Sequence, residues 1–256
     1  MFVDAHAHLD DPILAPREEE VIAAAKAAGV GIIVNASSDL PSSEASVALA
    51  ARHPEVYAVI GVHPHEAKTY TAEVEKRLAT LAAESKVVAF GEIGLDYHYD
   101  LSPRGVQKQV LETEIQFCAE LSLPVVFHVR EAYEDFNAII ERNKKYLKNG
   151  VLLHCYSGSA ELAKYYTKNF DAYFSFGGAL TFAKHKDEVL AVIPKDRLLL
   201  ETDCPYMTPV PFRGTPNEPK NIPLVAARMA ELTERTPEDI ERITTENALR
   251  FYSIKL

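Results

Sequence analysis

The sequence predicts an α/β protein: a single-domain barrel of the TIM type, (β/α)8, with extra helices at its C-terminal end. Short apolar runs alternate with stretches of helical periodicity, which is typical of parallel strands joined by helices. Eight such units in 256 residues match the size of a closed barrel. A doubly wound open sheet is the alternative, but the glycine-rich loop that binds nucleotides in such folds is missing after the first strand. We therefore expect residues 1–256 to form one barrel domain.

Each strand is expected where a short run is rich in aliphatic and aromatic residues. In chain order the expected strands are Phe2–His8, Gly31–Ala36, Val56–Val62, Val87–Gly91, Pro124–His128, Val151–His154, Ala172–Phe176 and Arg197–Glu201. Between them, apolar residues recur at helical spacing. The expected helices are Arg17–Ala28, Ser42–Arg52, Ala72–Ser85, Arg104–Leu121, Tyr133–Leu147, Ala160–Asn169, Lys184–Ile193, Pro219–Thr233 and Pro237–Phe251. The last of these has Thr236 as its N-cap, a proline at its first position and acidic residues in its first turn.

Composition and charge narrow the classes of function. The chain is 47% hydrophobic and 25% charged, as in a globular protein with a sizeable core. Its formal net charge of −10 argues against a broad basic surface for duplex nucleic acid, although bound metal ions can supply local positive charge. No apolar run approaches the roughly 18 residues of a membrane span, and no secretion signal is visible. The three cysteines, Cys118, Cys155 and Cys204, lack the spacing of a metal site. We expect a cytoplasmic monomer with no membrane association and no obligate protein partner.

The first strand raises the question of function, because it contains two histidines one residue apart. Alternate side chains of a strand point the same way, so Asp4, His6 and His8 are expected on one face, and Val3, Ala5 and Ala7 on the other. An edge strand with a wet face would explain this pattern, and so would a pair of metal ligands.

Polar side chains also follow most of the other expected strands. Six of the nine histidines lie at or near the C-terminal ends of strands, namely His6, His8, His63, His65, His128 and His154. Glu92, Glu201 and Asp203 lie at the same ends. In a barrel these ends form the catalytic rim. Ionisable groups that face inward are costly unless they are paired or bound to metal, so the set favours a metal site over packing.

The residue types suggest how such a site would work. Imidazole and carboxylate are the usual ligands of Zn²⁺, Mn²⁺ and related divalent ions. His6 and His8 can reach one ion, and the histidines of strands five and six can reach a second. Glu92 could bridge the two ions. Asp203 could complete the ligand shell of the first ion and accept a proton from the water bound to it. Two such ions stabilise the attacking and the leaving oxygens in hydrolysis.

The remaining histidines are less informative. His53, His98 and His185 lie at expected helix ends or in loops, and we expect them at the surface. His63 and His65 lie at the right rim without an obvious ligand geometry. They either contact substrate and support the ligands or have a structural role.

The motifs "DAHAHLD", "GVHPH", "GEIGLDY", "HVR", "HCYSG" and "LLLETDCPY", followed by "RG…NEP" and "ENALRFY", resemble the TatD family of metal-dependent deoxyribonucleases. Their order and spacing are specific, and they cover nearly the whole chain. The resemblance implies an amidohydrolase-like barrel with metal ligands at His6, His8, Glu92, His128, His154 and Asp203. It implies that Glu92 bridges and that Asp203 is also the general base. Ala7 stands where the family often has threonine or cysteine.

The resemblance further implies hydrolysis of phosphodiester bonds from the 3′ end of single-stranded DNA, so that DNA ends are the substrate. Mg²⁺ is often the activating ion in the family, although a histidine-rich shell suits Zn²⁺ or Mn²⁺ better. We therefore expect two divalent ions drawn from Mg²⁺, Mn²⁺ and Zn²⁺.

Several residues near the expected site are candidates for substrate contacts. Arg130 and Arg213 suit phosphate, because guanidinium matches phosphate oxygens bidentately, although surface salt bridges would also explain them. Glu201 and Asp4 are expected to orient the histidines from behind. Tyr97, Tyr156 and Tyr206 follow ligand-bearing strand ends and could stack on a base or pack at the rim.

Two other classes of function stay open at this point. Another hydrolase on the same two-metal barrel would act on an amide, a lactone or an ester such as an aminoacyl-tRNA, since fold alone does not choose the substrate. In the common binuclear amidohydrolases a carboxylated lysine bridges from strand four, where this chain has Glu92. A non-catalytic metal-binding or scaffold protein fits poorly, because the groups needed for catalysis are present.

Overall fold

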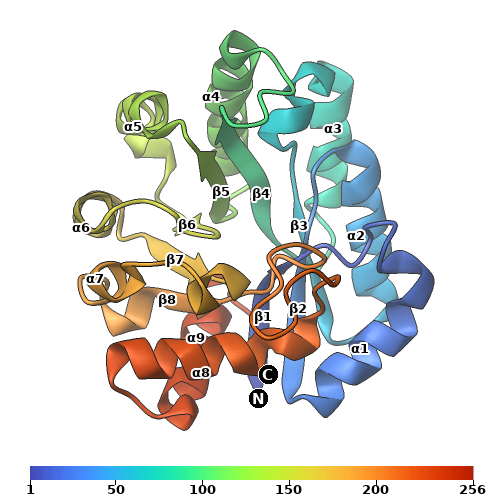
Figure 1. Ribbon diagram of the computed structural model, residues 1–256. Coiled ribbons are helices and arrows are strands. Elements are labelled where there is room, and N and C mark those ends of the chain that lie inside the picture. Colours follow the sequence, from blue (N-terminus) through green and yellow to red (C-terminus); the bar gives the residue numbers. More distant parts are fainter. Residues whose placement is uncertain (256) are drawn as a thin grey trace.

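The computed structural model describes residues 1–255 and forms one sheet of eight parallel strands in chain order (Figure 1). The strands are β1 (Phe2–Ala7), β2 (Val30–Ala36), β3 (Val56–Ile60), β4 (Val87–Asp96), β5 (Val125–Arg130), β6 (Val151–Leu153), β7 (Tyr173–Phe176) and β8 (Leu198–Leu200). The end of β1 meets the segment after β8, where Asp203 N donates to His6 O at 2.9 Å and His8 N donates to Cys204 O at 2.9 Å. The sheet thus curls into the predicted (β/α)8 barrel.

Helices surround the barrel (Figure 1). They are α1 (Glu18–Ala27), α2 (Leu40–Arg52), α3 (Ala72–Leu81), α4 (Arg104–Glu120), α5 (Tyr133–Arg142), α6 (Ala160–Phe170), α7 (Lys186–Leu190), α8 (Ile222–Thr233) and α9 (Pro237–Phe251). The two predicted C-terminal helices are α8 and α9, and the Thr236 side chain caps α9 by accepting from Asp239 N at 3.1 Å. The helix expected over Tyr133–Leu147 ends earlier, and a short 3₁₀ turn, Lys144–Tyr146, follows it. No helix within residues 1–255 has the length and apolar character needed to cross a membrane.

Two apolar layers stabilise this architecture. The larger layer lies between the strands and the surrounding helices, and the smaller one fills the barrel with one or more residues from every strand. The C-terminal segment plugs the interior, since Phe251 and Tyr252 join the smaller cluster and Tyr252 Oη donates to Ala5 O at 2.8 Å. Asn247 Nδ2 donates to Lys195 O and Leu198 O, as expected for a residue that ties α9 to the barrel. One end of the barrel is therefore closed by apolar packing.

A β-bulge in β1 decides which of its side chains face the interior. Asp4 pairs with Ile33 and Ala7 with Asn35, so β1 uses three residues where β2 uses two. An extra residue of this kind breaks the alternation of faces. Alternation along the whole strand, which the sequence analysis assumed, is therefore wrong.

The correction concerns Asp4 in particular. Val3 and Ala5 belong to the interior cluster, whereas Ala7 belongs to the outer layer, so the three do not share one face. Asp4 accepts hydrogen bonds from the backbone N–H of Thr202 at 2.9 Å and from its Oγ1 at 2.5 Å. It thus ties β1 to the segment after β8.

A second β-bulge occurs in β4. This strand continues five residues beyond its expected end at Gly91, to Asp96. Phe90 pairs with Val125 and Ile93 with Phe127, so β4 also contains one extra residue. Phe90, Ile93 and Leu95 pack in the outer layer. Glu92 is thereby turned toward the barrel interior instead of following the strand as a loop residue.

One expected surface histidine is in fact buried. His53 caps the C-terminal end of α2 with 7% exposure, and its Nε2 lies 2.5 Å from Glu18 Oε1 of α1. Spacing within one helix could not reveal this contact, because Glu18 is 35 residues away in the chain. His98 and His185 are exposed, as predicted, and pair with Glu131 and Glu188.

Candidate active site

A cluster of ionisable side chains lies at the C-terminal ends of the strands, opposite the apolar plug. Its members are His6 and His8 from β1 and its end, His63 after β3, Glu92 and Asp96 of β4, His128 of β5, His154 after β6, and Glu201 and Asp203 after β8. All six predicted metal ligands are among them. They are far apart in the sequence and meet because parallel strands of a barrel all end at the same rim.

Glu92 lies at the centre of the cluster, and its two carboxylate oxygens face different histidines. Oε1 is 3.7 Å from His6 Nε2 and 3.6 Å from His8 Nε2. Oε2 is 2.8 Å from His154 Nε2 and 3.5 Å from His128 Nδ1. The carboxylate thus stands between two groups of nitrogen ligands, which is the position a bridging ligand requires.

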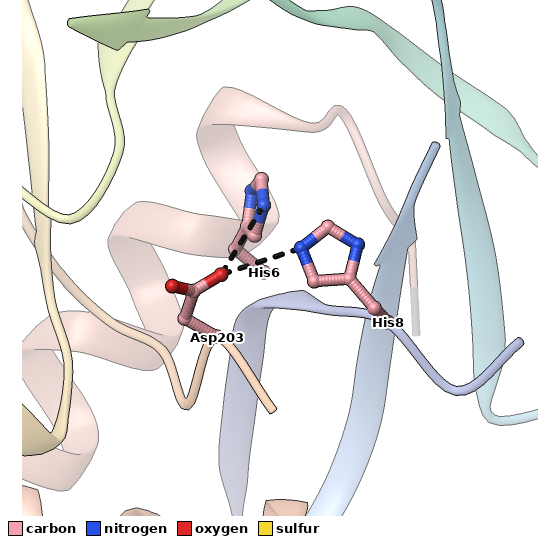
Figure 2. A group of neighbouring side chains, drawn as sticks. All are labelled: His6, His8 and Asp203. Carbon is pink, nitrogen blue, oxygen red and sulfur yellow. Dashed lines mark ion pairs between the residues drawn. The ribbon is translucent and has the colours of Figure 1, made fainter. Parts of the chain in front are cut away.

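Asp203 completes the first group. Its Oδ1 lies 3.3 Å from His8 Nε2 and 3.9 Å from His6 Nε2, and Figure 2 shows the one oxygen facing both rings. Ligand atoms of these three residues all lie within 4.8 Å of one another. The bulge in β1 brings both of its histidines to this side. Two nitrogens and one oxygen converging in this way are a donor set typical of Zn²⁺ or Mn²⁺.

The burial of His6 supports this assignment. Its side chain is fully buried, and neither ring nitrogen has a hydrogen-bond partner within residues 1–255. A buried polar atom without a partner costs free energy, and a cation bound between these groups would remove that cost at Nε2, the nitrogen that faces Glu92 and Asp203. The ring stacks on that of His154 at 3.9 Å between centroids, which holds it in place.

Two of the other proposed ligands, His8 and His128, have their far nitrogens anchored. His8 Nδ1 lies 2.9 Å from Ala36 O, and since a carbonyl only accepts, Nδ1 carries a proton and Nε2 faces Glu92 and Asp203. His128 Nε2 lies 3.1 Å from Asp96 Oδ2, and its Nδ1 faces Glu92 at 3.5 Å and His154 Nε2 at 3.2 Å. Such partners behind a ligand fix its tautomer and orientation.

Glu201, which is predicted to orient a histidine, lies behind His154 without a hydrogen bond between the two side chains. Its Oε1 lies 3.8 Å from His154 Nδ1, on the side of the ring away from Glu92. The Glu201 carboxylate is completely buried and accepts a hydrogen bond from Ser175 Oγ at 2.5 Å. Asp4, expected in a similar role, contacts Thr202 and the backbone N–H of His6 instead of an imidazole ring. Burial raises the pKa of Asp4 to about 8.

The charges of the surrounding histidines favour the ionised form of Glu92. Burial opposes ionisation of Glu92, but the neighbouring histidines hold its pKa well below the usual value. Burial lowers the pKa of His63 well below its usual value, so that this ring is neutral. His63 Nδ1 accepts from the backbone N–H of His65 at 3.1 Å, so the proton is on Nε2, 3.9 Å from Glu92 Oε2. His63 therefore presents an N–H toward the cluster, and its ring also lies in a group with Glu92 and His128 whose ligand atoms are within 4.8 Å of one another.

Asp96 is the residue of the cluster that the sequence analysis missed. It is fully buried, and its Oδ2 lies 2.9 Å from His65 Nε2 and 3.1 Å from His128 Nε2. Its Oδ1 accepts from the backbone N–H groups of His98 and Tyr99. The signal was present in "GEIGLD", where Glu92 and Asp96 are four residues apart and so share a face of an extended strand. The strand was expected to end too early for this to be recognised.

The two arginines lie on the rim and are not in salt bridges. The Arg130 guanidinium lies 4.9 Å above the ring of Tyr99, and that of Arg213 lies 3.6 Å above the ring of Phe182. Within residues 1–255, neither is within 4.0 Å of a carboxylate oxygen. No hydrogen bond between described residues joins Arg213 to the cluster. Both cations are therefore available to an anionic ligand.

The three candidate tyrosines differ in accessibility. Tyr156 is buried, and its hydroxyl donates to Ser159 O, so its ring is a packed rim residue. Tyr97 is half-buried and donates to Asp135 at 2.6 Å. Tyr206 is exposed, and its ring centroid lies 6.2 Å from that of His8. Only Tyr206 of the three presents an open ring face close to the cluster.

Comparisons with known proteins agree with this geometry. A family model described as "TatD related DNase" matches residues 3–253. A metal-dependent hydrolase of Bacillus subtilis, YabD, which is described as uncharacterized, is 45% identical over 99% of this chain and 100% of its own length. A protein of Cronobacter sakazakii named 3'-5' ssDNA/RNA exonuclease TatD is 36% identical over 91% of each chain.

Solved structures show the same architecture. The crystal structure of YJJV, a TatD homologue from Escherichia coli K12, superposes with a TM-score of 0.92 at 29% identity. The match covers 99% of this chain and 98% of that one. The similarity therefore extends over the whole barrel, including the strand ends that form the cluster.

Proposed function

This chain belongs to the TatD family of metal-dependent hydrolases, and on that premise we propose that it removes nucleotides from the 3′ end of single-stranded DNA. The observation that supports this proposal most directly is the position of Glu92. Its two oxygens face two separate groups of histidines, which is the arrangement expected for two divalent ions.

The proposed ligands divide between two ions. His6, His8 and Asp203 would hold the first ion, His128 and His154 the second, and Glu92 would bridge them. When bound, such ions stabilise the charge on the attacking and leaving oxygens of a phosphodiester. The histidine-rich donor set suits Zn²⁺ and Mn²⁺, and Mg²⁺ is the third candidate.

The protein's own side chains would do the rest. Asp203 is ionised, since hydrogen bonding to His8 and the positive potential of the histidines hold its pKa below the usual value against the effect of burial. It would accept the proton of the attacking water as general base. His63 would donate a hydrogen bond from its Nε2–H to a substrate oxygen, and the two rim arginines would bind phosphate.

The choice of DNA rests on the family and on the names of relatives. The Cronobacter relative is named an exonuclease of single-stranded DNA and RNA, whereas the Bacillus relative is named only a hydrolase. The alternative substrate class is an amide, a lactone or another ester, which the same pair of ions would also hydrolyse.

Metal-stripped protein should be incubated with single-stranded DNA labelled at its 3′ or its 5′ end, with Mg²⁺, Mn²⁺ or Zn²⁺ added back separately. We expect stepwise release of nucleotides from the 3′ end. His128→Ala should lose activity, because the second group of ligands is then incomplete. His185→Ala is the matched control, since His185 is exposed and pairs only with the neighbouring Glu188. If no ion supports cleavage of DNA, the substrate belongs to the amide and ester class.

A further inference from the structure

The exposed large apolar side chains of this protein are concentrated at the mouth of the barrel. Within residues 1–255 nine such side chains are exposed, and all but Met1 lie on loops that follow the C-terminal ends of strands. They are Ile13 after β1, Tyr99 and Leu101 after β4, Phe182 after β7, and Tyr206, Met207, Val210 and Phe212 after β8. Contiguous exposed apolar patches often mark binding sites, whereas single exposed apolar side chains are common and need no explanation.

Two of these aromatic rings flank the cluster of ligands. The ring of Tyr206 lies 6.2 Å from that of His8, beside the first group of ligands. The ring of Tyr99 lies 5.5 Å from that of His65, which shares Asp96 with His128 of the second group. A phosphate bound at the centre would therefore have one open aromatic ring on either side.

The ring of Tyr206 is held in place by contacts between neighbouring loops. The Tyr206 hydroxyl donates to Asp11 at 2.8 Å, which ties the loop after β8 to the loop after β1. Val210 N donates to Thr181 Oγ1 at 3.0 Å, which ties it to the loop after β7. In Figure 1 the loop after β8, drawn in orange, lies in front of β1 and β2. Ordered rings lose little entropy on binding, so they are effective contact surfaces.

Positive charge accompanies the aromatic rings. The unpaired guanidinium of Arg130 lies over Tyr99, and that of Arg213 over Phe182. On a chain with a net charge of −10, these cations are a local feature of the mouth. Aromatic faces next to arginines form the combination that binds single strands, in which bases stack and phosphates are neutralised.

We propose that Tyr99 and Tyr206 are stacking platforms for unpaired bases on the two sides of the reacting phosphate, with Phe182 and Arg213 as an outer contact. This inference rests on the proposed nuclease function and deepens it. The site would select nucleic acid whose bases are free to stack, so a paired end would have to fray before it is bound. Affinity would come mainly from the bases, because the mouth offers few cations.

The test compares two oligonucleotides of the same length, one with normal bases and one with abasic residues at its last three positions. Binding of each to the full-length, metal-loaded protein is measured by fluorescence anisotropy, with cleavage-resistant phosphorothioate linkages in both strands so that no cleavage occurs. Stacking contributes about 1–3 kcal/mol per base, so Tyr206→Ala and Tyr99→Ala should each weaken binding of the normal strand by about tenfold. Binding of the abasic strand should be unchanged.

Tyr206→Phe and Tyr99→Phe are the matched controls, since they keep the ring and remove only the hydroxyl. Tyr99→Phe should bind the normal strand as the wild type does. Tyr206→Phe should bind it more tightly than Tyr206→Ala does, since the ring stays although the hydrogen bond to Asp11 is lost. If the alanine variants bind both strands equally well, or lose both equally, the rings do not recognise bases and the proposal is wrong. The binding measurement is independent of catalysis, so failure of the nuclease proposal would appear separately, as absence of cleavage by the metal-loaded wild type.

Discussion

Asp96 positions two histidines with one carboxylate oxygen. Replacing it with asparagine keeps the acceptor for the backbone N–H groups of His98 and Tyr99 but places an NH₂ group against His128 Nε2. The ring can then no longer donate there, and its tautomer is released. Loss of a partner behind a metal ligand typically costs about 10–100-fold in metal affinity or activity.

We therefore expect Asp96→Asn to bind the activating ion about 10–100-fold more weakly while the fold persists. Isothermal titration calorimetry measures the affinity for the metal ion, and circular dichroism checks the fold. Asp135→Asn is the control, because Asp135 is partly exposed and its hydrogen bonds within residues 1–255 are to Tyr97 and Lys108, away from the cluster. Unchanged metal affinity in Asp96→Asn would show that His128 is held by packing alone.

Glu114 is a carboxyl group buried away from the cluster. It lies on α4 with 1% exposure and accepts from Val62 N at 2.9 Å. Burial, reinforced by the nearby charge of Glu75, raises its pKa well above the usual value. The folded protein therefore keeps a proton that the unfolded chain releases near pH 4.5, and stability falls as pH rises above that value.

Glu114→Gln removes this titration. We expect the free energy of unfolding of the wild type to fall relative to the variant by up to about 1.4 kcal/mol per pH unit between about pH 5 and 7. Urea unfolding at three pH values measures the difference, and Glu120→Gln, at an exposed position of the same helix, should show no such trend. A constant difference across this range would mean that Glu114 is ionised in the folded protein.

Among single residues, the sequence predicted which side chains gather at the rim but not which partners lie behind them. The proposed ligands could be placed together because each lies at or near the end of an apolar run, namely His6, His8, Glu92, His128, His154 and Asp203. Asp96 and the burial of His53 depend on contacts across more than thirty residues of chain, which periodicity does not report.

Among the elements, β4 departs most from regular geometry, and Gly94 makes its course possible. Gly94 has φ +154°, and a Cβ built there would lie 1.8 Å from His128 O on β5. Any side chain would push apart the two strands that position Glu92 and His128. We expect Gly94→Ala to destabilise the fold by about 3 kcal/mol or more, because strain and overpacking add.

Urea unfolding measures this effect, and Gly105→Ala is a well-matched control. Gly105 lies in the first turn of α4, where an added Cβ meets no atom within 4 Å. Alanine there should leave stability unchanged or raise it by up to about 1 kcal/mol. Equal stability of the two variants would show that β4 and β5 separate without cost.

The elements themselves were predictable, and their irregularities were not. Apolar runs located all eight strands to within a few residues, apart from the end of β4. The bulges in β1 and β4 arise from pairing with β2 and β5, and they reverse the face of a side chain without leaving a trace in local hydrophobicity. Asp4 was misplaced for this reason.

For the whole molecule, the alternation of strands and helices in the sequence predicted the barrel but not the plug that closes one of its ends. The plug formed by Phe251 and Tyr252 joins the last helix to the first strand and belongs to a second apolar cluster. Because this plug fills one end, the polar cluster has only the other end at which to meet substrate. The rim at this open end, and not the surface as a whole, must therefore provide the affinity for substrate.

The charge of the molecule then predicts how it moves along a strand. A net charge of −10 repels the backbone of the proposed DNA substrate outside the mouth, and Arg130 and Arg213 are two cations at the rim that can face it. For about two phosphates neutralised on a single strand, log K should fall with log salt with a slope of about −1.4. Binding of this kind is weak, so the enzyme should release its product after one or a few cleavages.

End-labelled strands can be digested at about 150 mM salt with an excess of unlabelled strand added as a trap once the reaction has begun. Distributive action predicts products shortened by one or a few nucleotides, with most substrate intact when the trap stops the reaction. Fully degraded strands beside untouched substrate would instead require a hold on the strand that outlasts many cleavages. Such a hold would have to come from the stacking platforms, because the charge of the protein opposes it.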